Sequence, residues 1–164
     1  MTFWGWYLRH VRIGDVAKLW IRRVRCGPCG DSHALLPEFV THGRLDGVEV
    51  IGAALTAMTA GAGARTVAAG VGVPHTTVRD WRRRFRARAA LLVAGFVAAT
   101  VVVSGSGPRL DGDDEAAAIV AIDGLWSEAS RRWQDRVGTR WRLANVIVGS
   151  HVLSTNTDPP WAVG

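Results

Sequence analysis

The segment Arg65-Thr-Val-Ala-Ala-Gly-Val-Gly-Val-Pro-His-Thr-Thr-Val-Arg-Asp-Trp-Arg-Arg-Arg-Phe85 decides the fold that the sequence predicts. It contains two short helical patterns. In the first pattern, Val67, Ala68 and Val71 form one apolar face. Gly72 follows at the point where the chain must bend, and glycine adopts a positive φ without steric cost. The segment therefore begins with a short helix and a tight turn.

The second helical pattern starts at Pro74, which suits the first turn of a helix because its missing N–H costs nothing there. Val78, Trp81 and Phe85 then recur on one face, as a helix that packs on the first requires. Together the two patterns predict a helix-turn-helix, whose second helix lies in the major groove of DNA. The alternative interpretation is a plain surface helix rich in arginine.

The opposite face of this second helix carries the candidate DNA contacts. At about 100° per residue, Thr76, Arg79 and Arg83 lie opposite the apolar face. Its N-terminal part is expected to reach base edges, and Thr77 with the later arginines to reach phosphates. Asp80 also faces outward, where it repels phosphates unless it accepts a bond from cytosine. The predicted DNA-binding residues are Arg65, His75, Thr76, Thr77, Arg79, Arg82, Arg83 and Arg86.

Charge is distributed unevenly along the chain. Residues 1–110 contain 15 Lys and Arg against 6 Asp and Glu, whereas residues 111–164 contain 5 against 8. The basic excess therefore lies in the part that contains the predicted helix-turn-helix. A polyanion such as DNA is the partner that this distribution favours.

The N-terminal part predicts β structure. Residues 6–11 and 16–26 are rich in aromatic and β-branched side chains and are separated by Gly14-Asp15. This pattern is typical of a β-hairpin. Residues 31–41 are expected to form a loop.

A first helix is expected between that loop and the helix-turn-helix. Asp46 is placed to cap it, and Gly61 and Gly63 are placed to end it. Its apolar positions are Val48, Ile51, Leu55 and Met58.

Residues 89–103 form an uncharged apolar run of 15 residues. A membrane-spanning helix needs about 20 apolar residues, so a buried helix is favoured over a membrane anchor. We expect the second helix of the helix-turn-helix to continue into this run. Residues 104–108 then predict a linker.

The C-terminal part predicts two further helices. Asp113 and Asp114 are placed to open the first, because acidic residues stabilise the positive end of a helix. Its apolar stripe must be covered either by the 89–103 helix or by a second subunit in a homodimer, and the intramolecular arrangement is favoured. A last helix is expected from Thr139 to Val152. The apolar stripe consists of Ile119, Ile122, Trp126, Ala129 and Trp133.

Cys26 and Cys29 have the Cys-x-x-Cys spacing of one half of a zinc ribbon. A structural zinc ion needs four ligands. His33 is a candidate for the third ligand, and His10, on the facing strand, for the fourth. A thioredoxin-type redox pair is the alternative, although that chemistry requires a helix after the first cysteine, where a loop is expected.

Together with the helix-turn-helix, three segments resemble a family of uncharacterised bacterial proteins in which a transposase-like zinc ribbon is fused to a helix-turn-helix. They are Arg23-Val-Arg-Cys-Gly-Pro-Cys-Gly-Asp-Ser-His-Ala-Leu-Leu-Pro37, Asp46-x-Val-Glu-Val-Ile51 and the C-terminal Trp141-Arg-Leu-Ala-Asn with Gly149-Ser-His-Val-Leu-Ser-Thr-Asn156-Thr. The resemblance implies that Cys26 and Cys29 are the second zinc knuckle. The family's first knuckle is missing here, so either the true start lies upstream or the ribbon has decayed.

We therefore expect a mainly α fold with a small N-terminal β-hairpin. Its parts are a truncated zinc-ribbon-like segment (1–42), a helix-turn-helix domain with a three-helix core (46–88), a C-terminal helical region (89–153) and an irregular tail (154–164). The start has no recognisable signal peptide, and two cysteines three residues apart suit a reducing compartment. The expected location is the cytoplasm, in association with the nucleoid.

Three functions are consistent with these features. The favoured one is a non-catalytic, sequence-specific DNA-binding protein, either a transcription regulator or the DNA-recognition part of a transposase-like system. The second is a membrane-tethered or structural interaction module built on residues 89–103. The third is a transposase remnant or nuclease, but the acids after Leu110 gather at one helix start and only 54 residues follow it, so helix capping explains them better.

Overall fold

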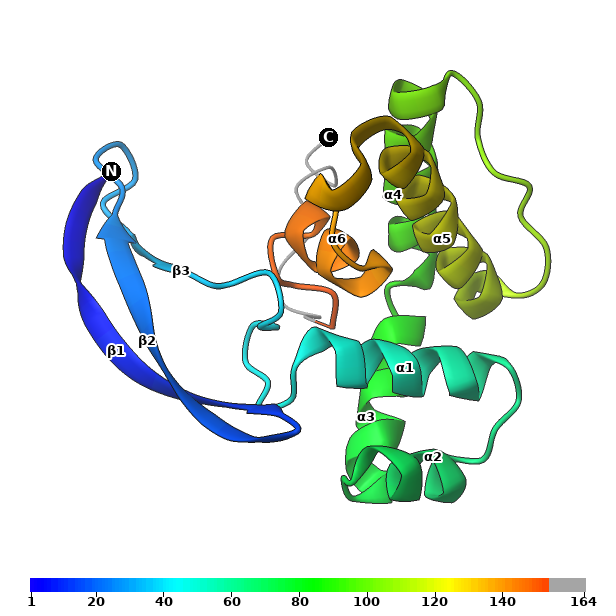
Figure 1. Ribbon diagram of the computed structural model, residues 1–164, viewed down its shortest axis with the longest axis horizontal. Coiled ribbons are helices and arrows are strands. Elements are labelled where there is room, and N and C mark those ends of the chain that lie inside the picture. The colour runs from blue at the N-terminus through cyan, green and yellow to red at the C-terminus, as the bar shows by residue number, and fades with distance from the viewer. Residues whose placement is uncertain (154–164) are drawn as a thin grey trace.

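The computed structural model describes residues 1–153 of the chain (Figure 1). Within these residues a three-stranded antiparallel sheet stands beside six α-helices and one short 3-10 helix. The fold is a helical body with a small N-terminal sheet, as predicted. The expected irregular tail, residues 154–164, lies outside the described residues.

The sheet contains β1 (Thr2–Ile13), β2 (Asp15–Arg25) and β3 (Ser32–Leu35), in that order. β1 and β2 form the expected hairpin, which turns at Gly14 with φ +80°. Trp6 lies opposite Arg22, and Leu8 opposite Trp20. The hairpin therefore has a long, regular register over most of its length.

The third strand was not predicted, and the expected loop over residues 31–41 is wrong at its N-terminal end. Gly30 has φ +73°, a conformation that glycine adopts without strain. The N–H of Cys26 donates to the carbonyl of Asp31 at 2.8 Å. These two features turn the chain back, so that β3 pairs with the end of β2.

One face of the hairpin packs toward the segment that joins the sheet to the helices. Val11 and Ile21 are fully buried on that face. The guanidinium of Arg9 donates to the carbonyls of Thr41 and Arg44, both at 2.7 Å. This anchoring fixes the hairpin to the start of the helical body.

Helix α1 (Val48–Thr59) has the predicted apolar face, but its start differs from the prediction. Gly47 is the residue that precedes the helix, and no side chain caps it. Asp46 does not act as the cap. It is buried instead, with Oδ1 3.5 Å from Nε of Arg12 on β1. The carboxylate therefore joins the hairpin to α1.

Helices α2 (Ala64–Val71) and α3 (His75–Arg86) follow and meet at a tight turn. Gly72 lies at the turn with φ +69°, in the left-handed region that favours glycine. The N–H of Val73 bonds the carbonyl of Ala68 at 3.2 Å and closes the turn. The core shared by α1, α2 and α3 includes Leu55, Met58, Val67, Ala68, Val78, Trp81 and Phe85.

Helix α4 (Ala89–Ser104) is separate from α3, which corrects the expectation of one continuous helix. The two axes are bent by 61° across the break at residues 87–88. The bend turns α4 into the core formed with α5. In the described part of the chain, no individual helix combines the length and apolar character needed to cross a membrane, and α3 with α4 meets that test only as a bent pair.

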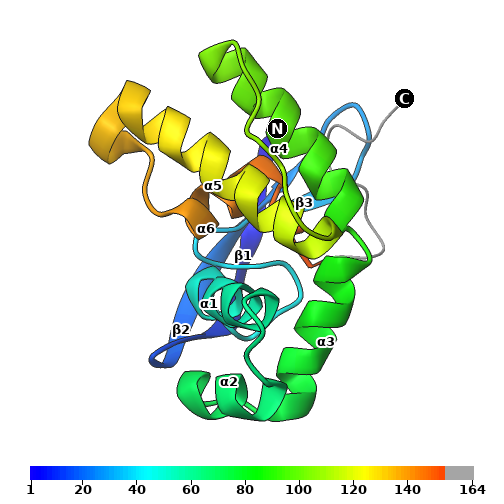
Figure 2. The same ribbon diagram turned by 90° about the vertical axis from the view of Figure 1, so that its right-hand side faces the viewer.

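Helix α5 (Asp114–Trp133) packs along α4 (Figure 2). As predicted, Asp113 caps it, accepting a bond from the N–H of Ala116 at 2.9 Å. The stripe on α5 is covered within the chain over Ile119, Ile122 and Ala129, whereas Trp133 stays 45% exposed. A short 3-10 helix, Gln134–Arg136, follows.

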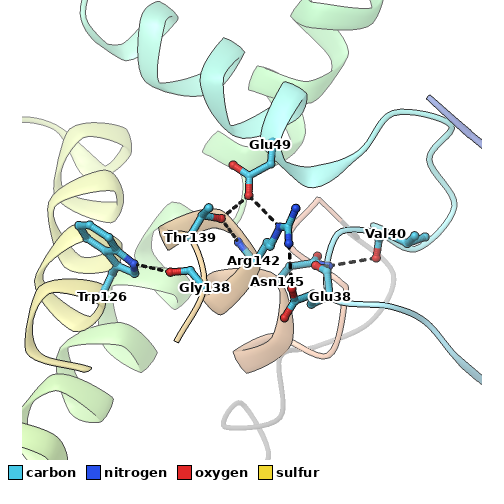
Figure 3. Close-up of polar contacts among 8 residues, drawn as sticks. All are labelled: Glu38, Val40, Glu49, Trp126, Gly138, Thr139, Arg142 and Asn145. Carbon is cyan, nitrogen blue, oxygen red and sulfur yellow. Dashed lines mark hydrogen bonds and ion pairs between the residues drawn. The ribbon is translucent and has the colours of Figure 1, made fainter. Parts of the chain in front are cut away.

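The last helix, α6 (Arg140–Ile147), is shorter than the expected Thr139–Val152 at both ends. Thr139 is its cap, and Gly149 and Ser150, with φ of +60° and +67°, do not continue the helix. Polar contacts attach α6 to α1 and to the linker after the sheet (Figure 3). The amide of Asn145 donates to the carbonyls of Glu38 and Val40, at 2.8 and 3.0 Å. The C-terminal helix is thereby fixed against residues about one hundred positions earlier.

Candidate nucleic-acid interface and metal centre

The exposed face of α3 is the candidate DNA interface. Val78, Trp81 and Phe85 are buried against α1 and α2. The opposite face is exposed at His75, Thr76, Arg79, Arg83 and Arg86, and Thr77 is half-buried. α3 lies at the edge of the helical body, with α2 beside its lower end in Figure 2. The predicted division of this helix into an apolar and a basic face is therefore present.

The arginines on this face are not equivalent. Arg83 donates to Asp80 at 2.5 Å, and Arg84 donates to the same carboxylate at 2.8 Å. Arg44 approaches it at 3.6 Å. Hydrogen bonding from Arg83, followed by that from Arg84 and the charges of Arg84 and Arg44, holds the pKa of Asp80 below its usual value, although burial opposes the shift. Asp80 is thus an organising counter-ion and not the free outward-facing charge expected from the sequence.

Two further arginines are paired with the start of α5. Nε of Arg82 lies 2.8 Å from a carboxylate oxygen of Glu115, and Nε of Arg86 lies 3.5 Å from the other. Glu115 is buried, with 2% of its side chain exposed. By contrast, Arg65 on α2 and Arg79 on α3 are exposed and have no ion-pair partner within residues 1–153.

A cleft lies between the α1–α2 loop and the basic face of α3. The loop contributes backbone at Gly61 and Gly63, and the helix contributes four arginines. A ligand in this cleft could therefore come close to the backbone at the two glycines while it faces several positive charges. Its arginines are Arg79, Arg82, Arg83 and Arg86.

Cys26, Cys29 and His33 form the candidate metal centre. Their ligand atoms all lie within 4.8 Å of one another, and Sγ of Cys29 is 3.7 Å from Nε2 of His33. β3 supplies the histidine, because its register places His33 opposite Val24 at the end of β2. These three residues could hold a metal ion, and two thiolates with an imidazole are a ligand set typical of zinc.

The structure does not bring His10 to this cluster. His10 lies opposite Lys18, while Thr2 lies opposite Arg25 next to the cysteines. At about 3.3 Å per strand residue, the eight residues between Thr2 and His10 span about 26 Å. The expectation that His10 supplies a fourth ligand is therefore wrong.

The two thiols of the cluster differ in acidity. A hydrogen bond from the backbone N–H of Cys29, and then one from its side chain, lowers the pKa of Cys26. A thiolate is the form that binds metal. No helix begins at Cys26, since a turn and then β3 follow it, and the arrangement therefore lacks the helix start that a thioredoxin-type pair uses.

Three acids on and just before α5 make structural contacts. Asp113 caps α5, and Glu115 pairs with α3. Asp123 accepts two bonds from Arg140, at 2.8 and 3.0 Å. These positions lie along one helix and are bound to different partners, so they do not converge on a common point.

One feature had no signal in the sequence. The rings of His42 and His151 lie 4.6 Å apart between centroids, in a pocket between β3 and the end of α6. The two residues are separated by more than one hundred positions, and only the folded chain brings them together. Burial, followed by the charges of His42 and Arg88, lowers the pKa of His151.

Comparison of the chain with models of known protein families gives no match, and comparisons with curated proteins and with solved structures give none either. The arguments on function therefore rest on the residues and their geometry.

Proposed function

We propose that the protein binds double-stranded DNA through a helix-turn-helix formed by α2 and α3. One observation carries the proposal. The face of α3 opposite the buried Val78, Trp81 and Phe85 is exposed and basic. A recognition helix needs this combination, because one face must be held by the domain while the other enters the groove.

Within this interface the N-terminal half of α3 is placed to read bases. His75, Thr76 and Arg79 are exposed there, and arginine pairs bidentately with guanine. Arg83 and Arg86, one and two turns later, are placed for phosphates, and the cleft beside the α1–α2 loop suits the same role. Arg65 and Thr77 complete the set of proposed contacts.

The proposed role is non-catalytic: a transcription regulator, or the DNA-recognition part of a transposase-like system, acting at the nucleoid in the cytoplasm. The resemblance to proteins with a zinc ribbon fused to a helix-turn-helix fits this role. The three-residue centre of Cys26, Cys29 and His33 supports a second, structural proposal, namely that zinc, with solvent as its fourth ligand, stabilises the turn between β2 and β3.

Titration of a labelled 30-base-pair duplex at several salt concentrations tests DNA binding. Log K is expected to fall with log salt by about 0.9 for each phosphate contact. The double variant Arg79→Ala/Arg83→Ala should bind more weakly and with a flatter salt slope.

The matched control is Arg131→Ala/Arg136→Ala, which removes two exposed arginines outside α3. This variant should bind like the wild type. Equal losses in both double variants would mean that net charge, and not α3, sets the affinity. Selection from a randomised duplex library then identifies the sequence that is read.

A further inference from the structure

The outer face of the β1–β2 hairpin has no role in the proposed duplex contact, yet it is the most aromatic surface of the described chain. Side chains alternate across a strand, and the register places one set on the face away from the helical body. All members of this set are exposed. They are Trp6, Leu8 and His10 on β1, and Lys18, Trp20 and Arg22 on β2.

Large apolar side chains are rarely exposed to solvent on the face of a sheet. Trp6 is 56% exposed and Trp20 is 68% exposed. Phe3 extends the surface, with its ring centroid 5.9 Å from that of Trp6. The solvent face of an antiparallel sheet is normally polar, and exposed apolar patches of this kind mark binding surfaces.

The two tryptophans are arranged as a pair. Trp6 lies opposite Arg22 and Leu8 lies opposite Trp20, so the two indoles are diagonal neighbours across the hairpin. Such neighbours are separated by about 7–8 Å, roughly twice the ~3.4 Å spacing of successive bases in a strand. The two rings line a shallow pocket between them. A flat ring of the size of a base fits between or on them.

Positive charge surrounds these rings. The guanidinium of Arg22 lies 5.4 Å from the centre of the Phe3 ring. Lys18 and Arg22 share this face with the two tryptophans, and the single acid of residues 2–25, Asp15, lies at the turn. The like charges oppose pairing of this face with a second copy and favour a polyanion.

We propose that this outer face binds single-stranded nucleic acid, with bases stacked on Trp6 and Trp20 and the backbone held by Lys18 and Arg22. Aromatic rings interleaved with basic residues bind single strands in this way, because every base has a π face. Bases in a duplex are already stacked on one another and present only their edges. The surface is thus a second site, separate from α3, that selects unpaired nucleotides.

The test uses the full chain, a labelled 20-nucleotide oligo-dT and an abasic strand of equal length and charge. Oligo-dT should bind, and the abasic strand should bind at least about tenfold more weakly, because it cannot stack. Trp6→Thr/Trp20→Thr should lower the affinity for oligo-dT on the order of tenfold or more. Threonine suits exposed strand positions, and circular dichroism checks the fold. Arg22→Gln, which keeps both rings, provides an independent variant and should weaken binding less.

Arg79→Ala/Arg83→Ala should keep the affinity for oligo-dT, whether or not it changes duplex binding, which separates the two sites. Equal binding of oligo-dT and the abasic strand, or an unchanged affinity in both the tryptophan variant and Arg22→Gln, would overturn the proposal. Two other results would also overturn it. In the first, binding to vesicles of anionic lipid depends on the two tryptophans while oligo-dT binding does not. In the second, dimer formation in sedimentation depends on them while oligo-dT binding does not.

Discussion

Arg82 on α3 and Glu115 at the start of α5 form an ion pair at 2.8 Å, with the carboxylate almost completely buried. The same carboxylate lies 3.5 Å from Arg86. Two of the arginines on the proposed DNA face are therefore held by a negative charge that belongs to the C-terminal helical region. This region and α3 are electrostatically connected, and the proposed duplex contact would compete with Glu115 for the two guanidinium groups.

Replacing Glu115 with glutamine should therefore strengthen duplex binding. Each arginine released to a phosphate adds about 0.9 to the salt slope and on the order of several-fold to the affinity at low salt. The same change should lower the free energy of unfolding by about 1–2 kcal/mol, because a charge-assisted hydrogen bond is lost. Salt-dependent duplex titration and thermal melting measure the two effects.

Asp114→Asn is the control for this prediction, since Asp114 is an exposed acid next to Glu115 and has no ion-pair partner within residues 1–153. It removes the same charge without releasing an arginine. A salt slope that stays unchanged in Glu115→Gln would show that Arg82 and Arg86 do not reach phosphates.

Gly52 on α1 marks a close contact with α6. A Cβ added there would lie 2.2 Å from the indole of Trp141, which is itself buried. Gly52→Ala should therefore destabilise the fold by about 1–3 kcal/mol, the usual cost of overpacking, although alanine is the better helix former. Chemical denaturation measures the loss.

Gly70 on α2 is the matched control for Gly52. It also lies within a helix, but a Cβ there meets no atom within 4 Å. Gly70→Ala should stabilise the protein by about 0.5–1 kcal/mol. If both variants gained stability, the contact between α1 and Trp141 would be looser than the structure shows.

The sequence predicted those elements whose stability depends on local pattern. The apolar positions of α1 and α3 were assigned correctly because a helix repeats its buried face every three to four residues. The capping of α5 by Asp113 was also predicted, since it depends on one side chain and an N–H three residues later.

The errors concern contacts between distant segments. β3 is only four residues long, and its existence depends on pairing with β2. Asp46 has the chemistry of a helix cap, but Arg12, more than thirty positions earlier, draws it into an ion pair. The bend between α3 and α4 likewise follows from packing on α5. Periodicity in one segment cannot reveal a partner in another.

The candidate metal centre shows the same division. The Cys-x-x-Cys spacing identified two ligands, and His33 was a candidate by proximity in sequence. The choice between His33 and His10 depended on the strand register, which the sequence does not contain. The register places His33 beside the two cysteines and His10 far along the hairpin from them.

Zinc binding should depend on Cys29 and not on His10, as the strand register predicts. Wild-type protein is expected to bind one Zn²⁺, and Cys29→Ser should lower the affinity by more than the roughly 10–100-fold that loss of an outer-shell partner costs. Binding should weaken as the pH falls, because the thiols must lose their protons. Competition with a chromogenic chelator measures the affinity. His10→Ala should bind zinc like the wild type, and a loss in that variant would contradict the three-residue site.

The neighbouring rings of His42 and His151 should make stability depend on pH. Burial, His42 and Arg88 lower the pKa of His151 in the folded protein, so the folded state binds fewer protons at this site than the unfolded chain, whose histidine pKa is about 6.5. Stability is then fully present above about pH 6.5 and is lost as the pH falls toward the lowered pKa. Thermal melts from pH 8 to pH 5 should show Tm falling below pH 6.5, and His151→Gln should flatten that fall. His75→Gln is the control, since His75 is exposed on α3. An unaltered pH profile in His151→Gln would assign the dependence to another group.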